Sequence, residues 1–287
     1  REIMRERLIY YHYKSQGNRQ AFYAEILQDQ EILYALYALS LQMPKKCLYQ
    51  TSCESVKKMS KNFILPEDLR KEMQIITIFD KAYPVSLKNI YDPPLVLYAK
   101  GDIRLLQNIC ISVIGTRTPS KNAYFVLQKM VSPLIDSKFC IVSGLANGID
   151  TYAHLFTMEK KGMTIAVLGS GFNYIYPKSN SRLANQIASS QLLLTEYPPY
   201  VRPQKWRFVE RNRIIAGLSI ATVVIEARAK SGTLITAQLA LEEGREIFAV
   251  PGSVFNENSV GCHRLIQEGA NLVCDGYDIL KICKQML

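Results

Sequence analysis

Hydrophobic and polar positions follow two different patterns along this chain, and the pattern changes near residue 75. Before that point, apolar side chains recur at the spacing of amphipathic helices, as at Ile26, Leu33, Leu36 and Tyr37. From residue 109 onward, short apolar runs alternate with longer helix-like segments. The two patterns predict a small all-helical domain over residues 1–72 and a larger domain over residues 73–287.

The larger domain is predicted to be an α/β fold. Its strand-like runs cover residues 109–114, 139–142, 164–168, 192–195, 220–225, 247–250 and 271–273. Helix-like segments lie between or after them, at 122–136, 150–160, 181–190, 208–217, 233–243, 261–268 and 277–287. This alternation is typical of a mostly parallel sheet with helices on both faces. Residues 75–100, with a Tyr-Pro turn and an Asp-Pro-Pro break, add one or two short strands that we expect to close one side.

The N-terminal segment is rich in tyrosine. Seven occur before residue 50, namely Tyr10, Tyr11, Tyr13, Tyr23, Tyr34, Tyr37 and Tyr49. At helical spacing we interpret them mainly as core residues, with stacking on nucleic-acid bases as the alternative. Residues 65–68, Leu-Pro-Glu-Asp, indicate a further helix start.

Composition describes an ordinary globular protein. Of 287 residues, 48% are hydrophobic and 21% charged, which is enough to bury a core. No apolar run approaches the roughly 18–20 residues that a membrane span needs, and the charged start REIMRER is unlike a secretory signal. Seven cysteines are scattered without a CxxC pair, so neither a disulfide framework nor a zinc site is indicated. We expect a cytoplasmic protein without a metal or cofactor.

The formal net charge of +10 narrows the class of partner. A basic surface attracts polyanions, and nucleic acid is the first candidate, ahead of an anionic membrane. A solvated surface that is merely basic is the plain alternative.

Four turns that contain glycine or serine follow the predicted strands. They are Gly115-Thr116-Arg117, Ser143-Gly144, Gly169-Ser170-Gly171 and Ser231-Gly232-Thr233. Each turn can leave backbone N–H groups exposed at a helix N-terminus, where the helix dipole favours an anion. The carboxyl ends of parallel strands share one sheet edge, so four turns together predict a composite anion-binding crevice.

The usual nucleotide fingerprints are missing. The turn GSGFNY at residues 169–174 lacks the third glycine of a dinucleotide site, and the pattern GxxxxGK[ST] does not occur.

Basic and aromatic side chains lie near the predicted turns. Arg117 follows Gly115, and Lys178 comes soon after the Gly169 turn. Lys205, Arg207 and Arg211 interleave with Trp206 and Phe208, a mixture suited to holding single-stranded nucleic acid. The two aromatic side chains fit a hydrophobic core equally well, and Arg213 fits either a buried ion pair or ligand contact.

The sequence offers little for catalysis. His12, His154 and His263 are far apart, and Asp150 is better explained as a helix-start residue than as a base. Glu226 ends a predicted strand, where it could bind a ribose or anchor Arg213. No nucleophile, base and orienting group combine, so we predict no enzyme activity.

The ordered motifs resemble the DNA-processing protein A (DprA/Smf) family of bacterial natural transformation. The matching stretches include VIGTRTPS (113–120), SGLANGID (143–150), GSGFNYIYPKSN (169–180), FVERNRIIAGLS (208–219) and SGTLITAQLALEEGREIFAVPG (231–252). The similarity covers residues 75–275.

This resemblance implies an extended Rossmann-like domain preceded by a small sterile-alpha-motif-like domain. It also implies a homodimer that binds single-stranded DNA without catalysis, protects incoming DNA and loads the RecA recombinase onto it. By this resemblance, Arg117 and Lys178 match the family's basic residues that contact DNA, and the Ser143-Gly144 and Gly169–Gly171 turns line the same pocket. The full predicted DNA site comprises Gly115, Thr116, Arg117, Ser143, Gly144, Gly169, Ser170, Gly171, Lys178, Asn180, Lys205, Arg207, Arg211, Asn212, Ser231 and Gly232.

The chain departs from the family pattern at a few positions. Asn147 stands where arginine is usual, Val209 where proline is usual, and Thr116 where serine is common. We expect no C-terminal winged-helix domain. The alternative function is a Rossmann-like nucleotide hydrolase of the phosphoribohydrolase type, with Glu226 and the Ser231 turn around a phosphate.

Overall fold

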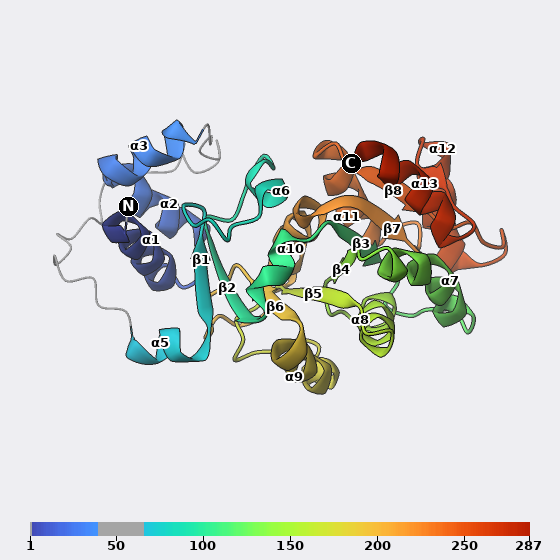
Figure 1. The fold of residues 1–287 in the computed structure, drawn as a ribbon, viewed down its shortest axis with the longest axis horizontal. Coiled ribbons are helices and arrows are strands. Elements are labelled where there is room, and N and C mark those ends of the chain that lie inside the picture. The colour runs from blue at the N-terminus through green and yellow to red at the C-terminus, as the bar shows by residue number, and fades with distance from the viewer. Residues whose placement is uncertain (1, 40–65) are drawn as a thin grey trace.

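The computed structural model describes residues 2–39 and 66–287, and its centre is a nine-stranded sheet. The strands are β1 (Gln74–Thr77), β2 (Val96–Gly101), β3 (Cys110–Ile114), β4 (Cys140–Ser143), β5 (Met163–Leu168), β6 (Leu192–Thr195), β7 (Ser219–Val224), β8 (Glu246–Ala249) and β9 (Asn271–Leu272). Their order across the sheet is β1-β2-β6-β5-β4-β3-β7-β8-β9 (Figure 1). Strand β2 pairs antiparallel with both β1 and β6, whereas every other neighbouring pair, from β6-β5 across the sheet to β8-β9, is parallel. The predicted Rossmann-like α/β fold is confirmed.

Helices connect the strands. The chain runs through α6 (Val85–Lys88), the 3-10 helix η1 (Ile103–Gln107), α7 (Ala123–Asp136), α8 (Ile149–Glu159), η2 (Lys178–Asn180), α9 (Ser181–Ser190), α10 (Lys205–Leu218), α11 (Gly232–Glu242), η3 (Glu257–Ser259), α12 (Val260–Gln267) and α13 (Gly276–Met286). Most bounds lie within a residue or two of those predicted. Helix α10 is the exception, because it begins at Lys205 rather than Phe208.

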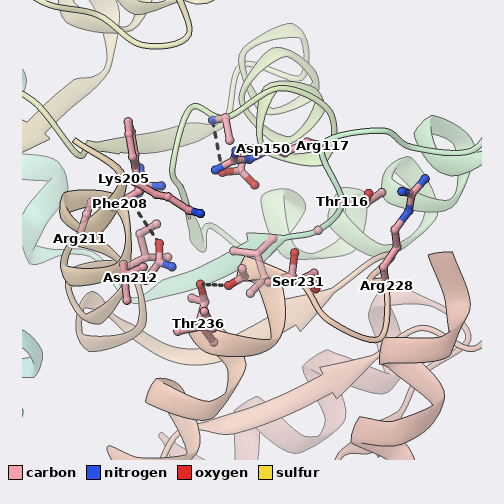
Figure 2. A pocket seen from close by; sticks show the side chains of 18 of the residues that line it. Thr116, Arg117, Asp150, Lys205, Phe208, Arg211, Asn212, Arg228, Ser231 and Thr236 are labelled. Carbon is pink, nitrogen blue, oxygen red and sulfur yellow. Dashed lines mark hydrogen bonds between the residues drawn. The ribbon is translucent and has the colours of Figure 1, made fainter. Parts of the chain in front are cut away.

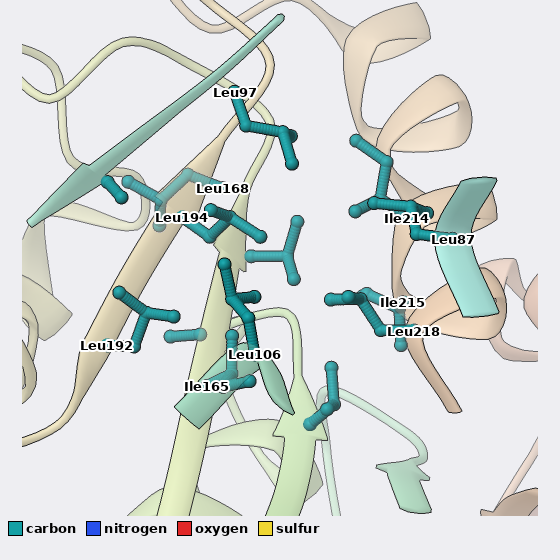
Figure 3. Packing of buried hydrophobic residues seen from close by; sticks show 14 of the residues in the cluster. Leu87, Leu97, Leu106, Ile165, Leu168, Leu192, Leu194, Ile214, Ile215 and Leu218 are labelled. Atoms are coloured by element: carbon teal, nitrogen blue, oxygen red, sulfur yellow. The ribbon is translucent and has the colours of Figure 1, made fainter. Parts of the chain in front are cut away.

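Alternation along the central strands fills two cores, one on each face of the sheet. In β3, Ile111 and Val113 face α7, α8 and α13, whereas Cys110 and Ile114 belong to the opposite core. That second core receives Ile214 and Leu218 of α10, as Figure 3 shows beside strand residues such as Ile165 and Leu194. Burying one Leu or Ile side chain stabilises a fold by about 1.5–3 kcal/mol. The two-sided burial explains why these strands are mostly apolar on both faces.

The N-terminal helices are α1 (Glu2–Lys14), α2 (Arg19–Gln28) and α3 (Gln30–Ala38), followed after a gap by α5 (Glu67–Glu72). Asn18 and Asp29 cap α2 and α3 by accepting hydrogen bonds from backbone N–H groups of the first turn. Pro66 lies just before α5. The predicted helical character is confirmed for residues 2–38; Leu65 lies outside the described residues.

The tyrosines of this region divide between core and surface. Tyr11 and Tyr23 are buried as expected, whereas Tyr34 and Tyr37 are exposed, so the core interpretation is wrong for those two. Tyr49 lies outside the described residues. Leu8, Ile9 and Ile26 join the same core as β2, so the helices pack directly on the antiparallel edge of the sheet.

Candidate nucleic-acid interface

The sheet reverses its winding between β3 and β7, and a cleft opens at their carboxyl ends. Strands β4, β5 and β6 follow on one side of β3, whereas β7, β8 and β9 follow on the other. Loops that leave such a switch point diverge and leave room for a ligand. The cleft has a volume of about 810 Å³. The loops after β3 and β7 and the helices α10 and α11 line it (Figure 2).

The loops around the cleft are tied together through backbone hydrogen bonds. Thr116 N–H donates to the carbonyl of Glu226 at 2.8 Å, and Ile149 N–H donates to the carbonyl of Thr116 at 3.2 Å. Gly148 has φ of 80°, and a Cβ there would lie 2.3 Å from the Thr116 oxygen. Only glycine fits that close approach without strain. The predicted turn Gly115-Thr116-Arg117 therefore forms one wall of the cleft.

The second open turn lies at the start of α11. Ser231 and Gly232 both line the cleft, and a Cβ placed on Gly232 would have no atom within 4 Å beyond its chain neighbours and the backbone of its own helix. The Ser231 side chain makes no capping hydrogen bond to α11. Backbone N–H groups of the first helical turn have no intrahelical acceptor. The predicted anion-binding character of this turn therefore has a structural basis.

Charge around the cleft is strongly one-sided. Five basic residues line it, against one acidic residue, Asp150; the five are Arg117, Lys205, Arg211, Arg228 and Lys230. Asp150 accepts a hydrogen bond from Gly144 N–H at 3.1 Å, and burial raises the pKa of its carboxyl group. Within the described part of the chain, Arg117, Lys205, Arg228 and Lys230 form no ion pair, although Arg228 Nε donates a hydrogen bond to Asn258 Oδ1 at 3.0 Å. They are all exposed.

Arg228 and Lys230 are absent from the site predicted from the sequence. They lie in the loop between β7 and the Ser231 turn. Two basic residues directly before a turn of small residues at the start of a helix could have been recognised in the sequence as further phosphate ligands.

Arg211 is buried, which corrects the expected exposed strip of Lys205, Arg207 and Arg211. Its Nη1 donates to the carbonyls of Gly144 and Val167, at 2.7 and 2.6 Å, and its Nε donates to Asn212 Oδ1 at 3.2 Å. Burial lowers the pKa of the guanidinium to about 10. The carbonyl groups at the ends of β4 and β5 explain why Arg211 can be buried, because they accept the hydrogen bonds that the guanidinium would otherwise lose on leaving water.

Arg207 is directed away from the cleft. It donates to the carbonyl of Arg202, and its guanidinium lies 5.3 Å from the Tyr197 ring centroid and 4.8 Å from that of Trp206. Lys205 is therefore the one member of the expected strip that is both exposed and in the cleft.

An aromatic pair forms part of the cleft wall. The rings of Tyr176 and Phe208 have centroids 5.3 Å apart, and both residues line the cleft. Phe208 also covers Gly169, where a Cβ would lie 2.6 Å from its ring. Phe208 thus packs partly in the core and partly lines the cleft, so both alternatives, core residue and stacking surface, apply to it. Trp206 is 46% exposed.

The other two predicted turns are not open to this cleft. The Oγ of Ser170 donates to the carbonyl of Tyr174, and Gly171 N–H donates to the carbonyl of Val201. Ser143 is buried and its Oγ donates to the carbonyl of Val113. Gly144 lines a smaller adjoining cavity with Arg117 and Tyr176. The crevice is therefore built mainly from two turns rather than four.

The remaining predicted residues fall on either side of the cleft boundary. Asn212 lines the cleft. Lys178 is exposed in η2 but does not line it. Asn180 is buried and its Nδ2 donates to Leu145 O and Thr151 Oγ1, so it braces the neighbouring loop. DNA contact by any of these residues stays a prediction.

Glu226 and Arg213 have different partners from those considered. The Glu226 carboxylate accepts hydrogen bonds from Ser120 N, Ser120 Oγ and Asn258 Nδ2, behind the cleft wall. Arg213 is buried and bonds instead to Asp92 and Glu196. The proposed Glu226–Arg213 pair is wrong, and a buried role for Arg213 is confirmed.

The histidines do not meet at the cleft. His12 bonds to Tyr98 and His154 to Thr164, both in buried positions, and His263 lies beside Gly252. Over residues 2–39 and 66–287, no cluster of histidine, cysteine and acidic side chains is arranged to hold a metal. No helix in these ranges is both long and apolar enough to cross a bilayer.

Comparisons with known proteins agree on one family. The family model described as DNA recombination-mediator protein A matches residues 74–284. The chain is 46% identical over 215 residues to DNA processing protein DprA of Streptococcus pneumoniae, covering 74% of this chain and 76% of the relative. It is 47% identical over 207 residues to the Bacillus subtilis DprA, covering 72% and 70%.

Two solved structures share the fold over the same share of this chain, 74%. The crystal structure of Streptococcus pneumoniae DprA matches with a TM-score of 0.71 at 45% identity, over 75% of that protein. A Helicobacter pylori DNA processing protein A, whose structure concerns its single-stranded DNA binding mode, matches with a TM-score of 0.67 at 28% identity, over 96% of its chain. The chain therefore belongs to the DNA recombination-mediator protein A family.

Proposed function

We propose that this protein binds single-stranded DNA in the 810 Å³ cleft at the β3–β7 switch point. The observation that carries this proposal is the arrangement of four exposed cations, Arg117, Lys205, Arg228 and Lys230, around the open N-terminus of α11. None of them forms an ion pair with another described residue. Cationic side chains and the N–H groups at helix N-termini are both common protein ligands of phosphate.

The aromatic wall supports a preference for single strands. Tyr176 is 50% exposed and lies against Phe208 at the cleft edge, beside the cations. Aromatic side chains can stack on unpaired bases, whereas the base faces of a duplex are covered by their neighbours. Bases placed on this wall would leave their phosphates toward Arg117 and Lys205.

The wider role that we propose follows the family. The protein would act in the cytoplasm during natural transformation, protect incoming DNA and load RecA recombinase, working as a homodimer. Family membership and the DNA-binding Helicobacter pylori relative support this role. The hydrolase alternative receives no support from the geometry, because Glu226 is engaged behind the cleft wall.

Binding of labelled oligo-dT and of a duplex of equal length tests the proposal. We expect Arg117→Glu to weaken oligo-dT binding by about tenfold, since a phosphate contact becomes a repulsion. Lys129→Glu, the same charge change at an exposed position on α7, is the matched control and should bind normally.

Two other variants refine the result. Lys178→Glu measures whether the DNA extends beyond the cleft to η2. Equal binding by the Arg117 variant and the parent would contradict the proposed site. Release of free base from nucleoside monophosphates would instead favour the hydrolase.

A further inference from the structure

One side of helix α10 lines the cleft, and another side contacts the turn between α1 and α2 and the first residue of α2. Its cleft face carries Lys205, Phe208 and Asn212. On the other side, Arg207 lies against Gly17, in the turn that joins α1 to α2. Contacts on this second side therefore influence the position of the residues that line the cleft, because both sides belong to one helix.

A buried ion-pair network holds the second face of α10. Arg213 Nε donates to Asp92 Oδ2 at 3.0 Å, and its Nη2 donates to both carboxylate oxygens of Glu196, at 2.7 and 2.8 Å. The Arg213 and Glu196 side chains are only 8% and 9% exposed. Burial alone would lower the pKa of Arg213, but the Glu196 and Asp92 carboxylates outweigh it and raise that pKa. The Arg213 guanidinium therefore stays charged in its buried position.

Arg19 extends this network into the N-terminal helices. It is the first residue of α2, and its Nη2 lies 2.5 and 2.6 Å from the two oxygens of Asp92. Its Nη1 lies 3.8 Å from Glu210 Oε1 on α10, while Tyr197 donates to the other Glu210 oxygen at 3.0 Å. One side chain from the N-terminal region thus reaches α10 both directly and through Asp92.

The charge balance shows why Arg19 matters. Three carboxylates, those of Asp92, Glu196 and Glu210, surround two guanidinium groups, those of Arg19 and Arg213. Without Arg19, one cation would face three carboxylates, two of which do not belong to α10. Repulsion of Glu210 by the carboxylates of Asp92 and Glu196 would then displace α10.

We propose that Arg19 is a positioning residue for the DNA cleft, through which the N-terminal helices hold α10 in its binding position. This inference rests on the proposed function for its effect on DNA, but the effect on α10 itself is independent of DNA. The N-terminal helices thereby act on DNA binding without lining the cleft.

The chain contains its own probe of α10. Trp206 is the single tryptophan and occupies the second position of this helix, 46% exposed. Its emission spectrum and its quenching by acrylamide therefore report the surroundings of α10 alone. Arg19→Ala should change both, whereas Arg19→Lys, which keeps a cation, should restore most of the parent signal.

Arg5→Ala is the matched control. Arg5 on α1 also ties the N-terminal helices to the sheet, through Asp80 at 2.9 Å and the Ile75 carbonyl at 2.7 Å. Within residues 2–39 and 66–287 it forms no hydrogen bond or ion pair with α10. We expect both alanine variants to lower the melting temperature. Only Arg19→Ala should alter Trp206 quenching and weaken oligo-dT binding, by about threefold to tenfold, which lies within the range seen for mutations that act through a coupled element.

Each outcome decides the matter. Equal Trp206 signals and equal DNA affinities in the Arg19→Ala and Arg5→Ala variants would overturn the proposal and leave the network a purely stabilising one. A changed Trp206 signal with unchanged oligo-dT affinity would overturn the link to DNA. If the parent itself binds no DNA, the proposed function fails, while the Trp206 comparison still decides whether Arg19 positions α10.

Discussion

At the scale of single residues, Arg211 shows how a charged side chain can serve the cleft from beneath its surface. Its guanidinium joins the carbonyls of Gly144 and Val167, at the ends of two neighbouring strands. Gly144 accommodates it closely, since a Cβ there would lie 2.7 Å from the guanidinium carbon. Arg211 therefore links α10 to β4 and β5 below the DNA-binding surface that we propose.

We expect Arg211→Lys to lower the free energy of unfolding by about 1–3 kcal/mol, because a lysine ammonium cannot reproduce the spread of donors that a guanidinium offers. Urea unfolding measures this change. Arg104→Lys, at an exposed ion pair with Asp102, is the control and should leave stability unchanged. An Arg211→Lys protein as stable as the parent would show that the carbonyls are satisfied without the guanidinium.

At the scale of elements, a buried histidine joins α8 to β5. His154 on α8 bonds through Nδ1 to Thr164 Oγ1 at 2.7 Å, and that hydroxyl donates to the Ile141 carbonyl. Nδ1 must therefore carry the proton that is donated. Burial lowers the pKa of His154 to about 3. Folding thus favours the neutral ring.

The sign of the pH effect follows from this lowered pKa. Between the unfolded value of 6.5 and the folded value of about 3, the unfolded chain binds the extra proton, so stability falls as pH drops through this window. At pH 5 the loss is about 2 kcal/mol for one such histidine. We expect His154→Asn, which keeps a donor but cannot titrate, to lose less stability than the parent between pH 7 and pH 5. Parallel pH profiles of the two proteins would contradict this assignment.

The elements also show what the sequence can and cannot predict. Strand β6 and helix α9 begin and end where the apolar pattern predicts, because local turn residues and tertiary packing agree there. Helix α10 begins earlier than predicted, since Lys205–Phe208 has no apolar spacing of its own. Burial of Arg211 depends on carbonyls 67 and 44 residues away in sequence, which no local pattern reveals. The positions of the four turns could be predicted from the sequence. That the loop at Pro198 and Pro199 covers the turn at Gly171 could not, because this contact joins distant parts of the fold.

At the scale of the whole molecule, the net charge of +10 is spread over the chain, whereas the cleft concentrates four exposed cations in one place. DNA binding by the cleft and DNA binding by the whole basic surface should depend differently on salt concentration. If Arg117, Lys205, Arg228 and Lys230 each neutralise one phosphate, the slope of log affinity against log salt concentration should be about −3 on single strands. Binding by diffuse surface charge would involve many more residues and give a steeper slope.

The double variant Arg228→Ser and Lys230→Ser separates the two cases. Loss of two phosphate contacts should reduce the slope by about 1.4, because each contact contributes about 0.7. Affinity for oligo-dT at low salt should fall with it, while the Lys129→Glu control keeps the parent slope. A salt titration of oligo-dT binding measures both quantities. If instead the control and the double variant changed the slope alike, the charge of the whole surface, and not the cleft, would hold the DNA.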